Sequence, residues 1–400
     1  MSHVALAPSD RVPRRFALRL AGALALVAGL APRGALAQAD LPEGDADDPP
    51  SAIRSEPLSK LPRVLPSASA DELARAWKAR FEATVKRLNQ RFKGRIALFV
   101  SDPKLGVRVG VDHERPSYLA SGVKVPFMVE VFRQVHQGTL SLDEELVYDA
   151  DAIRDGAPRM NQKPLGSKVK VRELLTLMIK DSDNAASDMI ARRVGLENIN
   201  RGLEEEGFVG FTPLTYLIDV RRATLRAVDL RADDLSPQEI RDVRWVVGWD
   251  SQAKKLAELC GRPAGTYKGK DLIAGFDRFY ETDVNSARLD AVAMLLERIV
   301  KKELVSADAS RQMLDLMTNT HTSRNRILGK LPAGLTVAHK TGSQYERICD
   351  LGIIFLSPDE PLVFTACLAG GNDRNLAEAT LADLARDAVD AAMPAHPKKR

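Results

Sequence analysis

Apolar residues recur at helical spacing in the segment that follows residue 69, and this pattern predicts an amphipathic helix. Its apolar positions are Leu73, Trp77, Phe81, Val85 and Leu88. Ser69 and Glu72 have the spacing of a capping box, so the helix is expected to begin there. Short apolar runs at 96–101 and 107–111 then predict two strands joined by a turn.

The middle of the chain has a mostly helical pattern, and strand-like runs return near its end. The clearest helical segments are 171–180, 184–194 and 287–300, the later strands are 335–340, 350–356 and 362–368, and a last helix covers 376–392. Strands at both ends with helices between them predict an α/β part at about 69–116 and 316–395 beside an all-α part at about 117–315.

The first 39 residues have the order of an export signal. Four arginines precede an apolar run at 20–31, and small-x-small patterns follow at 35–37 and 37–39. Twelve apolar residues are too few to span a bilayer stably, although a retained membrane anchor is the alternative reading. We therefore expect a signal peptide at 1–39, a proline-rich acidic linker at 40–68, and a protein exported to the periplasm or the medium without stable membrane insertion.

The charge balance of the chain argues against nucleic acids as partners. The chain has 58 Lys and Arg against 54 Asp and Glu, but five arginines and one aspartate lie in the first 39 residues, so the remainder is balanced at 53 to 53. A balanced body argues against a nucleic-acid partner. The six histidines lack zinc spacing and no glycine-rich phosphate loop is present, so we expect neither a metal nor an organic cofactor.

Ser-x-x-Lys pairs occur four times, so the pair alone does not identify a catalytic serine. They are Ser101/Lys104, Ser121/Lys124, Ser167/Lys170 and Ser251/Lys254. Only Ser121 stands at the first turn of a strongly apolar predicted helix, where the helix dipole favours developing negative charge. Lys124 lies one turn on, and burial would lower its pKa so that a neutral amine could take the serine proton. An N-cap role for Ser121 is the alternative.

Two further motifs each occur once in the chain. Ser182-Asp183-Asn184 lies at a junction between predicted helices, and Lys340-Thr341-Gly342 lies on a predicted strand. Each has a structural alternative, because Ser182 could cap a helix and Lys340 could be a surface lysine near a turn. The three motifs in this order and context favour a serine acyl-transfer site.

Together these segments resemble the penicillin-recognising serine hydrolases, in particular the class A β-lactamase branch. The resemblance covers most of residues 70–395. It is carried by 118–126 around Ser121, by 171–186 around the Ser-Asp-Asn motif, and by 325–342, which ends in Lys-Thr-Gly. It implies a β-lactamase/transpeptidase-like fold with an antiparallel sheet of about five strands, flanked by helices, and an inserted helical domain.

The resemblance also implies catalytic roles. Ser121 would attack the carbonyl and become acylated, Lys124 would activate it, and Ser182 would pass a proton to the leaving nitrogen beside Lys340. The backbone N–H groups of Ser121 and Ser343 would form the oxyanion hole.

Substrate-binding roles follow in the same way. Asn184 would bind Lys124 or the substrate side-chain amide, Thr341 and Ser343 would hold the substrate carboxylate, and Gly342 would allow close approach. Arg347 is a candidate ion-pair partner for that carboxylate, and a surface loop arginine is the alternative.

One departure from the family puts deacylation in doubt. Class A enzymes activate the hydrolytic water with a Glu in a Glu-x-x-Leu-Asn loop, and this chain has instead a long insertion at about 221–285. The nearest approximation is Glu281-Thr-Asp-Val-Asn285, with Val in place of Leu. We expect a β-lactamase that acts through an acyl-enzyme on Ser121. The alternatives are a D,D-peptidase acting on D-Ala-type stem peptides with slow deacylation, and a non-catalytic cell-wall binding module.

The oligomeric state and the cysteines complete these expectations. We expect a monomer whose partner is a small β-lactam or peptide substrate. Cys349 and Cys367 flank a predicted hairpin turn and would face the same side, so a disulfide is possible. We favour two buried thiols.

Overall fold

The computed structural model describes residues 68–371 and 373–396. The predicted signal peptide and the predicted linker, apart from Ala68, lie outside the described residues. Within the described ranges, no helix is long and apolar enough to cross a membrane.

A five-stranded antiparallel sheet forms the centre of the fold, in the order β2-β1-β9-β8-β7. Its strands are β1 (Arg95–Asp102), β2 (Val107–Val111), β7 (Thr336–Gln344), β8 (Arg347–Ser357) and β9 (Glu360–Ala369). The pairing of β1 with β9, for example Leu98 opposite Ala366, joins the N-terminal hairpin to the C-terminal strands. The two ends of the described chain therefore complete one sheet, as the sequence predicts.

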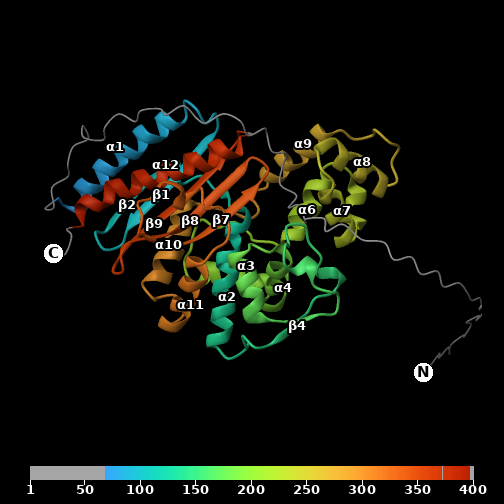
Figure 1. Cartoon of the computed structure of the whole chain (residues 1–400), viewed down its shortest axis with the longest axis horizontal. Helices are drawn as coiled ribbons and strands as arrows, with labels where there is room; N and C mark the ends of the chain where they lie inside the picture. The colour runs from blue at the N-terminus through green and yellow to red at the C-terminus, as the bar shows by residue number, and fades with distance from the viewer. Residues whose placement is uncertain (1–67, 372, 397–400) are drawn as a thin grey trace, which may run out of the picture. The chain divides into compact units, whose positions relative to one another are not determined.

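Two long helices, α1 (Ala70–Leu88) and α12 (Arg374–Ala392), cover one face of this sheet (Figure 1). The capping box that begins α1 is confirmed, because the Glu72 N–H donates to Ser69 Oγ and the Ser69 N–H donates to Glu72 Oε2. Trp77 and Phe81 of α1 are fully buried in the core that includes strand residues. Burying one such side chain stabilises the fold by about 2 kcal/mol.

A larger helical layer packs on the opposite face. Its helices are α2 (Lys124–His136), α3 (Val171–Lys180), α4 (Asn184–Val194), α5 (Leu196–Glu205), α10 (Leu289–Val300) and α11 (Ala307–Thr318). Phe127 of α2 and Leu296 of α10 share one buried core with Leu351 of the sheet. Two short ribbons lie around this layer, β3 (Ser117–Tyr118) with β6 (Ser286–Ala287) and β4 (Glu145–Val147) with β5 (Lys168–Lys170).

The long insertion folds as a group of helices with a small core of its own. It comprises α6 (Leu217–Arg226), α7 (Pro237–Trp245), α8 (Trp249–Leu259) and α9 (Gly269–Tyr280). Ile240, Leu256 and Leu272 lie at the centre of that core. Figure 1 shows these helices grouped together, apart from α1 and α12.

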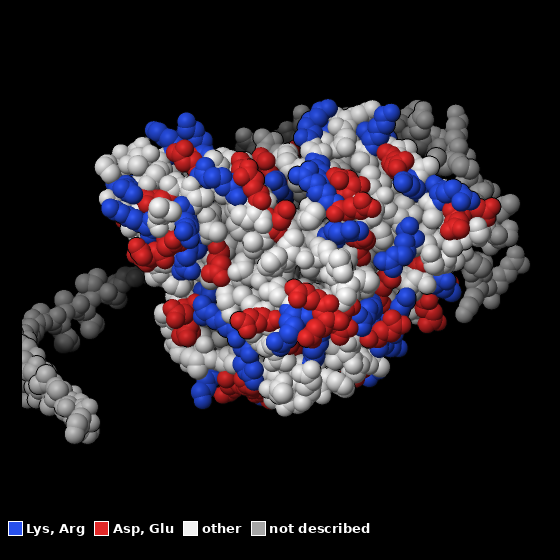
Figure 2. All heavy atoms as spheres, turned by 180° about the vertical axis from the view of Figure 1, so that it is seen from behind, with Lys and Arg blue, Asp and Glu red and all other residues white. Residues whose placement is uncertain are grey.

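Charged side chains are interspersed over the face shown in Figure 2, where Lys and Arg alternate with Asp and Glu. On this face, such mixing leaves no extended area of one charge sign.

Cys349 and Cys367 are joined by a disulfide, so our preference for two buried thiols is wrong. The two residues lie directly opposite each other in the β8–β9 ladder. The pairing depends on strand register, which the predicted turn alone does not fix. Cys260 is a buried free thiol in the insertion.

A buried charged pair attaches the C-terminal end of the described chain to the sheet. His396 Nε2 lies 2.5 Å from the Asp102 carboxylate, and His396 Nδ1 lies 3.5 Å from Glu360 Oε1. The hydrogen bond with Asp102 raises the pKa of His396 above its ordinary value.

This pair predicts a pH-dependent contribution to stability. A raised pKa means that the stabilisation is full at low pH and is lost as the pH rises through that value. We expect His396→Ala to lower the free energy of unfolding by about 2 kcal/mol near pH 5.5 and by clearly less near pH 9. Urea denaturation of both proteins at both pH values measures the difference. An equal loss at the two pH values would show that the imidazolium charge has no part in the attachment.

Candidate active site

Ser121 lies in a tight turn that leads directly into α2. The turn is a 3-10 helix at Ala120–Val123, one step before the helix on which the sequence analysis places this serine. Ala120 has a φ of +49°, a conformation that L-residues rarely adopt and that surrounding contacts must hold. Ser121 is partly exposed, and within the described residues its hydroxyl makes no hydrogen bond.

Two buried lysines converge on the hydroxyl of Ser182. Lys124 Nζ donates to Ser182 O at 2.6 Å, Ser182 Oγ at 3.1 Å and Asn184 Oδ1 at 2.9 Å. Lys340 Nζ donates to Ser182 Oγ at 2.9 Å and to Thr341 O at 3.0 Å. The three motifs, which are far apart in the sequence, therefore meet at one point.

Burial changes the acid–base properties of both amines. It lowers the pKa of Lys124 to about 7, and the nearby charges of Asp183 and Asp188 only partly offset this effect. Burial, followed by repulsion from Lys124, also holds the pKa of Lys340 well below its usual range. A neutral lysine amine, able to accept a proton, is therefore accessible near neutral pH.

Asp183 holds the backbone turn that presents Ser182. Its carboxylate accepts N–H bonds from Ala186 at the start of α4 and from Arg159 and Met160 in the preceding loop. Ser182 itself has a φ of +56°. The three backbone bonds stabilise this turn, which points the Ser182 hydroxyl toward both lysines.

Strand β7 lies against the Ser121 turn because residue 342 is glycine. A Cβ at Gly342 would lie 2.1 Å from the Leu119 carbonyl oxygen, far closer than atoms can approach. β7 is also an edge strand, so one row of its backbone groups has no strand partner and can bind a substrate. Ser343, the next residue, is exposed, whereas Thr341 is nearly fully buried.

Arg326 supports the exposed end of β7, a role that the sequence analysis missed. Its fully buried guanidinium donates to Gly342 O at 2.9 Å, Cys349 O at 3.0 Å and Ser343 Oγ at 2.7 Å. Glu378 neutralises part of its charge at 3.1 Å. The only sequence signal is its place in the segment 325–342 that resembles the family.

Arg347 contacts residues other than those of the expected carboxylate site. Its guanidinium is stacked 4.1 Å from the centre of the Tyr280 ring, and its Nη1 donates to Glu346 O. Among the described residues, the Arg347 side chain makes no hydrogen bond or ion pair with Thr341 or Ser343. The structure therefore favours Arg326 over Arg347 as the cation behind the expected carboxylate site.

The backbone of the approximate Glu-x-x-x-Asn segment lies against the Ser121 turn, since the Asn285 carbonyl accepts the Leu119 N–H at 3.0 Å. Within the described residues, however, neither Glu281 nor Asn285 makes a side-chain hydrogen bond with Ser121, Lys124 or Ser182. Glu281 is exposed at the C-terminal end of α9, and Asn285 is a buried structural residue whose Oδ1 accepts the Thr215 N–H at 2.8 Å. The carboxylates that act most strongly on Lys124 are Asp183, Asp188 and Asp155, all aspartates.

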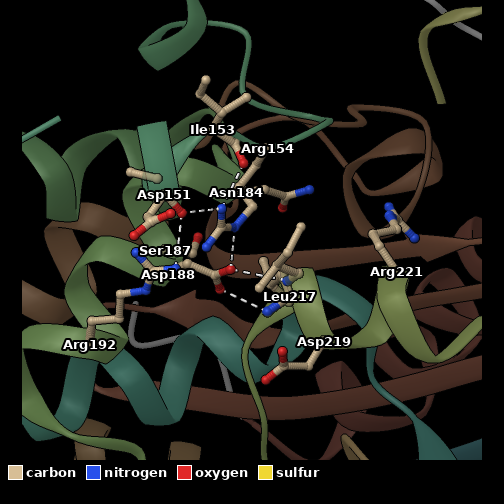
Figure 3. A network of polar contacts seen from close by, with 12 residues as sticks. Asp151, Ile153, Arg154, Asn184, Ser187, Asp188, Arg192, Leu217, Asp219 and Arg221 are labelled. Atoms are coloured by element: carbon tan, nitrogen blue, oxygen red, sulfur yellow. Dashed lines mark hydrogen bonds and ion pairs between the residues drawn. The ribbon is translucent and has the colours of Figure 1, made fainter. Parts of the chain in front are cut away.

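A buried ion pair fixes the insertion beside this site (Figure 3). Arg154 Nε contacts Asp188 Oδ2 at 2.5 Å, and both side chains are almost fully buried. The Asp188 carboxylate also accepts the N–H groups of Leu217 and Ile218 at 2.7 and 3.0 Å. Asp188 of α4 thereby caps α6, whose own preceding residue provides no side-chain cap. Arg221 follows further along α6.

Among the described residues, no group of three or more His, Cys, Asp or Glu side chains is placed to hold a metal ion.

Comparison with known proteins identifies the family. Residues 80–392 match the family model described as the β-lactamase enzyme family. The chain belongs to this family. It is 22% identical over 310 residues to the β-lactamase VEB-1 of Pseudomonas aeruginosa, a match that covers 75% of this chain and 83% of that protein.

Solved structures show that this β-lactamase family member has the class A fold. A β-lactamase from Chitinophaga pinensis superposes with a TM-score of 0.60 at 20% identity, covering 78% of this chain and 99% of that one. A variant of PBP-A, solved as an acyl-enzyme complex with penicillin G, gives a TM-score of 0.59 at 19% identity over 78% of this chain and 96% of that one. The predicted fold class, including the five-stranded antiparallel sheet, is confirmed.

Gly342 provides a direct test of the β7 contact. We expect Gly342→Ala to push β7 away from the Ser121 turn and to slow acylation by a β-lactam about a hundred-fold, because small displacements of reacting groups have large effects. Stopped-flow acylation kinetics measure the rate. Gly329→Ala is a suitable control, since its Cβ would meet Ala382 Cβ at 3.2 Å and the Arg324 carbonyl oxygen only at 3.7 Å. Near-normal acylation by Gly342→Ala would contradict the proposed placement.

Proposed function

We propose that this protein is an exported serine hydrolase in which β-lactams acylate Ser121, with slow release of the acyl group. The observation that carries the proposal is the Ser182 hydroxyl held between two buried lysine amines, at 3.1 and 2.9 Å, at the point where the three motifs meet. Membership of the β-lactamase enzyme family supports the same class of reaction.

We assign the steps of acylation to these groups as follows. Ser121 Oγ attacks the lactam carbonyl carbon, and its proton passes to the neutral amine of Lys124. The backbone N–H groups of Ser121 and Ser343 stabilise the resulting oxyanion. The C–N bond then breaks, and the nitrogen takes a proton from Ser182 Oγ. A proton from one of the two lysines bonded to Ser182 restores its hydroxyl.

Substrate binding uses both sides of this centre. We assign the substrate carboxylate to Thr341 and Ser343, with Arg326 2.7 Å behind the Ser343 hydroxyl. Asn184 binds the amide on the acyl side, with its Oδ1 shared with Lys124. Gly342 leaves room for the backbone between them to contact the substrate.

Deacylation is where this chain differs from the class A pattern. A hydrolytic water needs a base, and the aspartates nearest to Lys124 are occupied in capping or ion pairing. This arrangement favours slow release, so a D,D-peptidase acting on D-Ala-type stem peptides is the second candidate function. The intact set of polar groups around Ser182 argues against a non-catalytic binding module.

Intact-mass spectrometry after mixing with benzylpenicillin tests the proposal. We expect one added penicillin mass that persists well beyond acylation, because the aspartates nearest to Lys124 are engaged in capping or ion pairing. Ser121→Ala should abolish the adduct, whereas Ser251→Ala, at an exposed serine of another Ser-x-x-Lys pair, should form it normally. Absence of an adduct in the wild-type protein would reject acylation, and rapid loss of the adduct would reject slow release.

The pH dependence of acylation tests the role of Lys124. Its amine accepts a proton only when neutral, and its pKa is about 7. We therefore expect the acylation rate to fall about ten-fold for each pH unit below 7 and to level off above 8. Stopped-flow measurements across this range supply the profile. A rate independent of pH between 5 and 8 would exclude Lys124 as the base.

A further inference from the structure

A second charged cluster lies one contact beyond Asn184. The Asn184 side-chain amide donates to Asp155 O at 2.9 Å, so Asp155 adjoins the acyl side of the proposed site. The Asp155 carboxylate pairs with Arg221 Nε at 2.8 Å, and Arg244 Nε lies 3.9 Å from the same oxygen. One carboxylate therefore faces two guanidinium groups, both contributed by the insertion.

These guanidinium groups retain donors that have no acceptor. Arg221 Nη1 and Arg244 Nε are buried and make no hydrogen bond in the described structure. A buried donor without a partner is costly, and native proteins generally satisfy such groups with protein, water or a ligand. The Asp155 carboxylate cannot neutralise both cations, so the cluster carries an excess positive charge.

Two other buried guanidinium groups of the described residues, those of Arg80 and Arg154, are different. Arg80 and Arg154 also have one nitrogen without a partner, but each is matched by its own carboxylate, Asp387 or Asp188. Near Asn184, by contrast, two guanidinium groups share one carboxylate. Burial and the repulsion from Arg221 lower the pKa of Arg244 to about 10, as expected for a cation with too little opposing charge.

Aromatic rings connect the cluster to the hairpin that follows Ser343. The Arg244 guanidinium lies 5.6 Å from the ring centres of both Trp249 and Phe276. These rings contact Tyr345 at 5.0 and 5.8 Å, and Tyr345 comes two residues after Ser343 on the β7–β8 hairpin. A weakly hydrated guanidinium held on aromatic rings is a favourable partner for a carboxylate.

We propose that Arg221 and Arg244 form a subsite that binds a carboxylate on the acyl side of the substrate, next to the group held by Asn184. Arg221 Nη1 and Arg244 Nε donate to the carboxylate oxygens and thereby gain the acceptors that they lack. The preferred substrates are acidic acyl donors, namely a peptide with a carboxylate on the residue before the scissile bond, or a penicillin with a carboxylate on its side chain. This inference rests on the proposed acylation of Ser121.

Carbenicillin and benzylpenicillin provide a matched pair of probes, because they differ by one carboxylate on the acyl side chain. We expect the wild-type protein to be acylated more efficiently by carbenicillin. Arg244→Gln and Arg221→Gln should each lower the carbenicillin-to-benzylpenicillin ratio of acylation efficiency about ten-fold. Arg244→Lys should retain part of the preference, since it keeps the charge.

Arg226→Gln is the control for general charge effects. Arg226 is on the same helix as Arg221, but its side chain is 58% exposed and pairs with Asp233. We expect the ratio to be unchanged in this variant. A ratio equally unchanged in Arg221→Gln and Arg244→Gln would overturn the subsite, as would a ratio that falls as much in Arg226→Gln.

If the variants do not fold, the salt dependence of acylation in the wild-type protein tests the subsite instead. Raising NaCl from about 0.05 to about 0.5 M should weaken carbenicillin acylation more than benzylpenicillin acylation. Equal salt dependence would overturn the inference. Adducts from both penicillins without a preference would reject the subsite alone, whereas no adduct from either would reject the proposed function and the subsite with it.

Discussion

The site depends on keeping two lysine amines out of water at a single hydroxyl. Two ammonium groups repel each other strongly where solvent is excluded, so the protein favours a state in which one of them is neutral. The Ser182 and Thr341 carbonyls and the Asn184 amide oxygen stabilise the amine that keeps its proton. The capped turn at Ser182 and the close approach of β7 at Gly342 both serve to maintain this arrangement.

The fold could be predicted well where local patterns determine structure. The predicted helices at 171–180 and 184–194 have the bounds of α3 and α4, and the capping box at Ser69 begins α1. The candidate residues could be found from the sequence because each motif is a short local pattern. The contacts between the motifs are not local, since Ser182 and Lys340 are 158 positions apart. Only the family resemblance linked them before the structure did.

What the sequence could not supply depends on packing between distant side chains. Arg326 has no motif of its own, and its position behind Ser343 follows from the way its segment packs against β7 and β8. The position of the insertion beside the site likewise becomes clear only from the three-dimensional structure. The insertion contributes Arg221, whose positive charge adds to the effect of burial in lowering the pKa of Lys124. A cation there favours a neutral amine for acylation and provides no base for water.

The disulfide between β8 and β9 lies directly beneath these elements. The Cys349 sulfur is 3.4 Å from the Tyr118 carbonyl oxygen, three residues before Ser121, and the Cys349 carbonyl accepts a bond from Arg326. Glutathione and thioredoxin keep such thiols reduced in the cytosol, whereas oxidising compartments allow the bond to persist. The disulfide that supports the turn of the proposed nucleophile therefore forms only where the redox environment allows it.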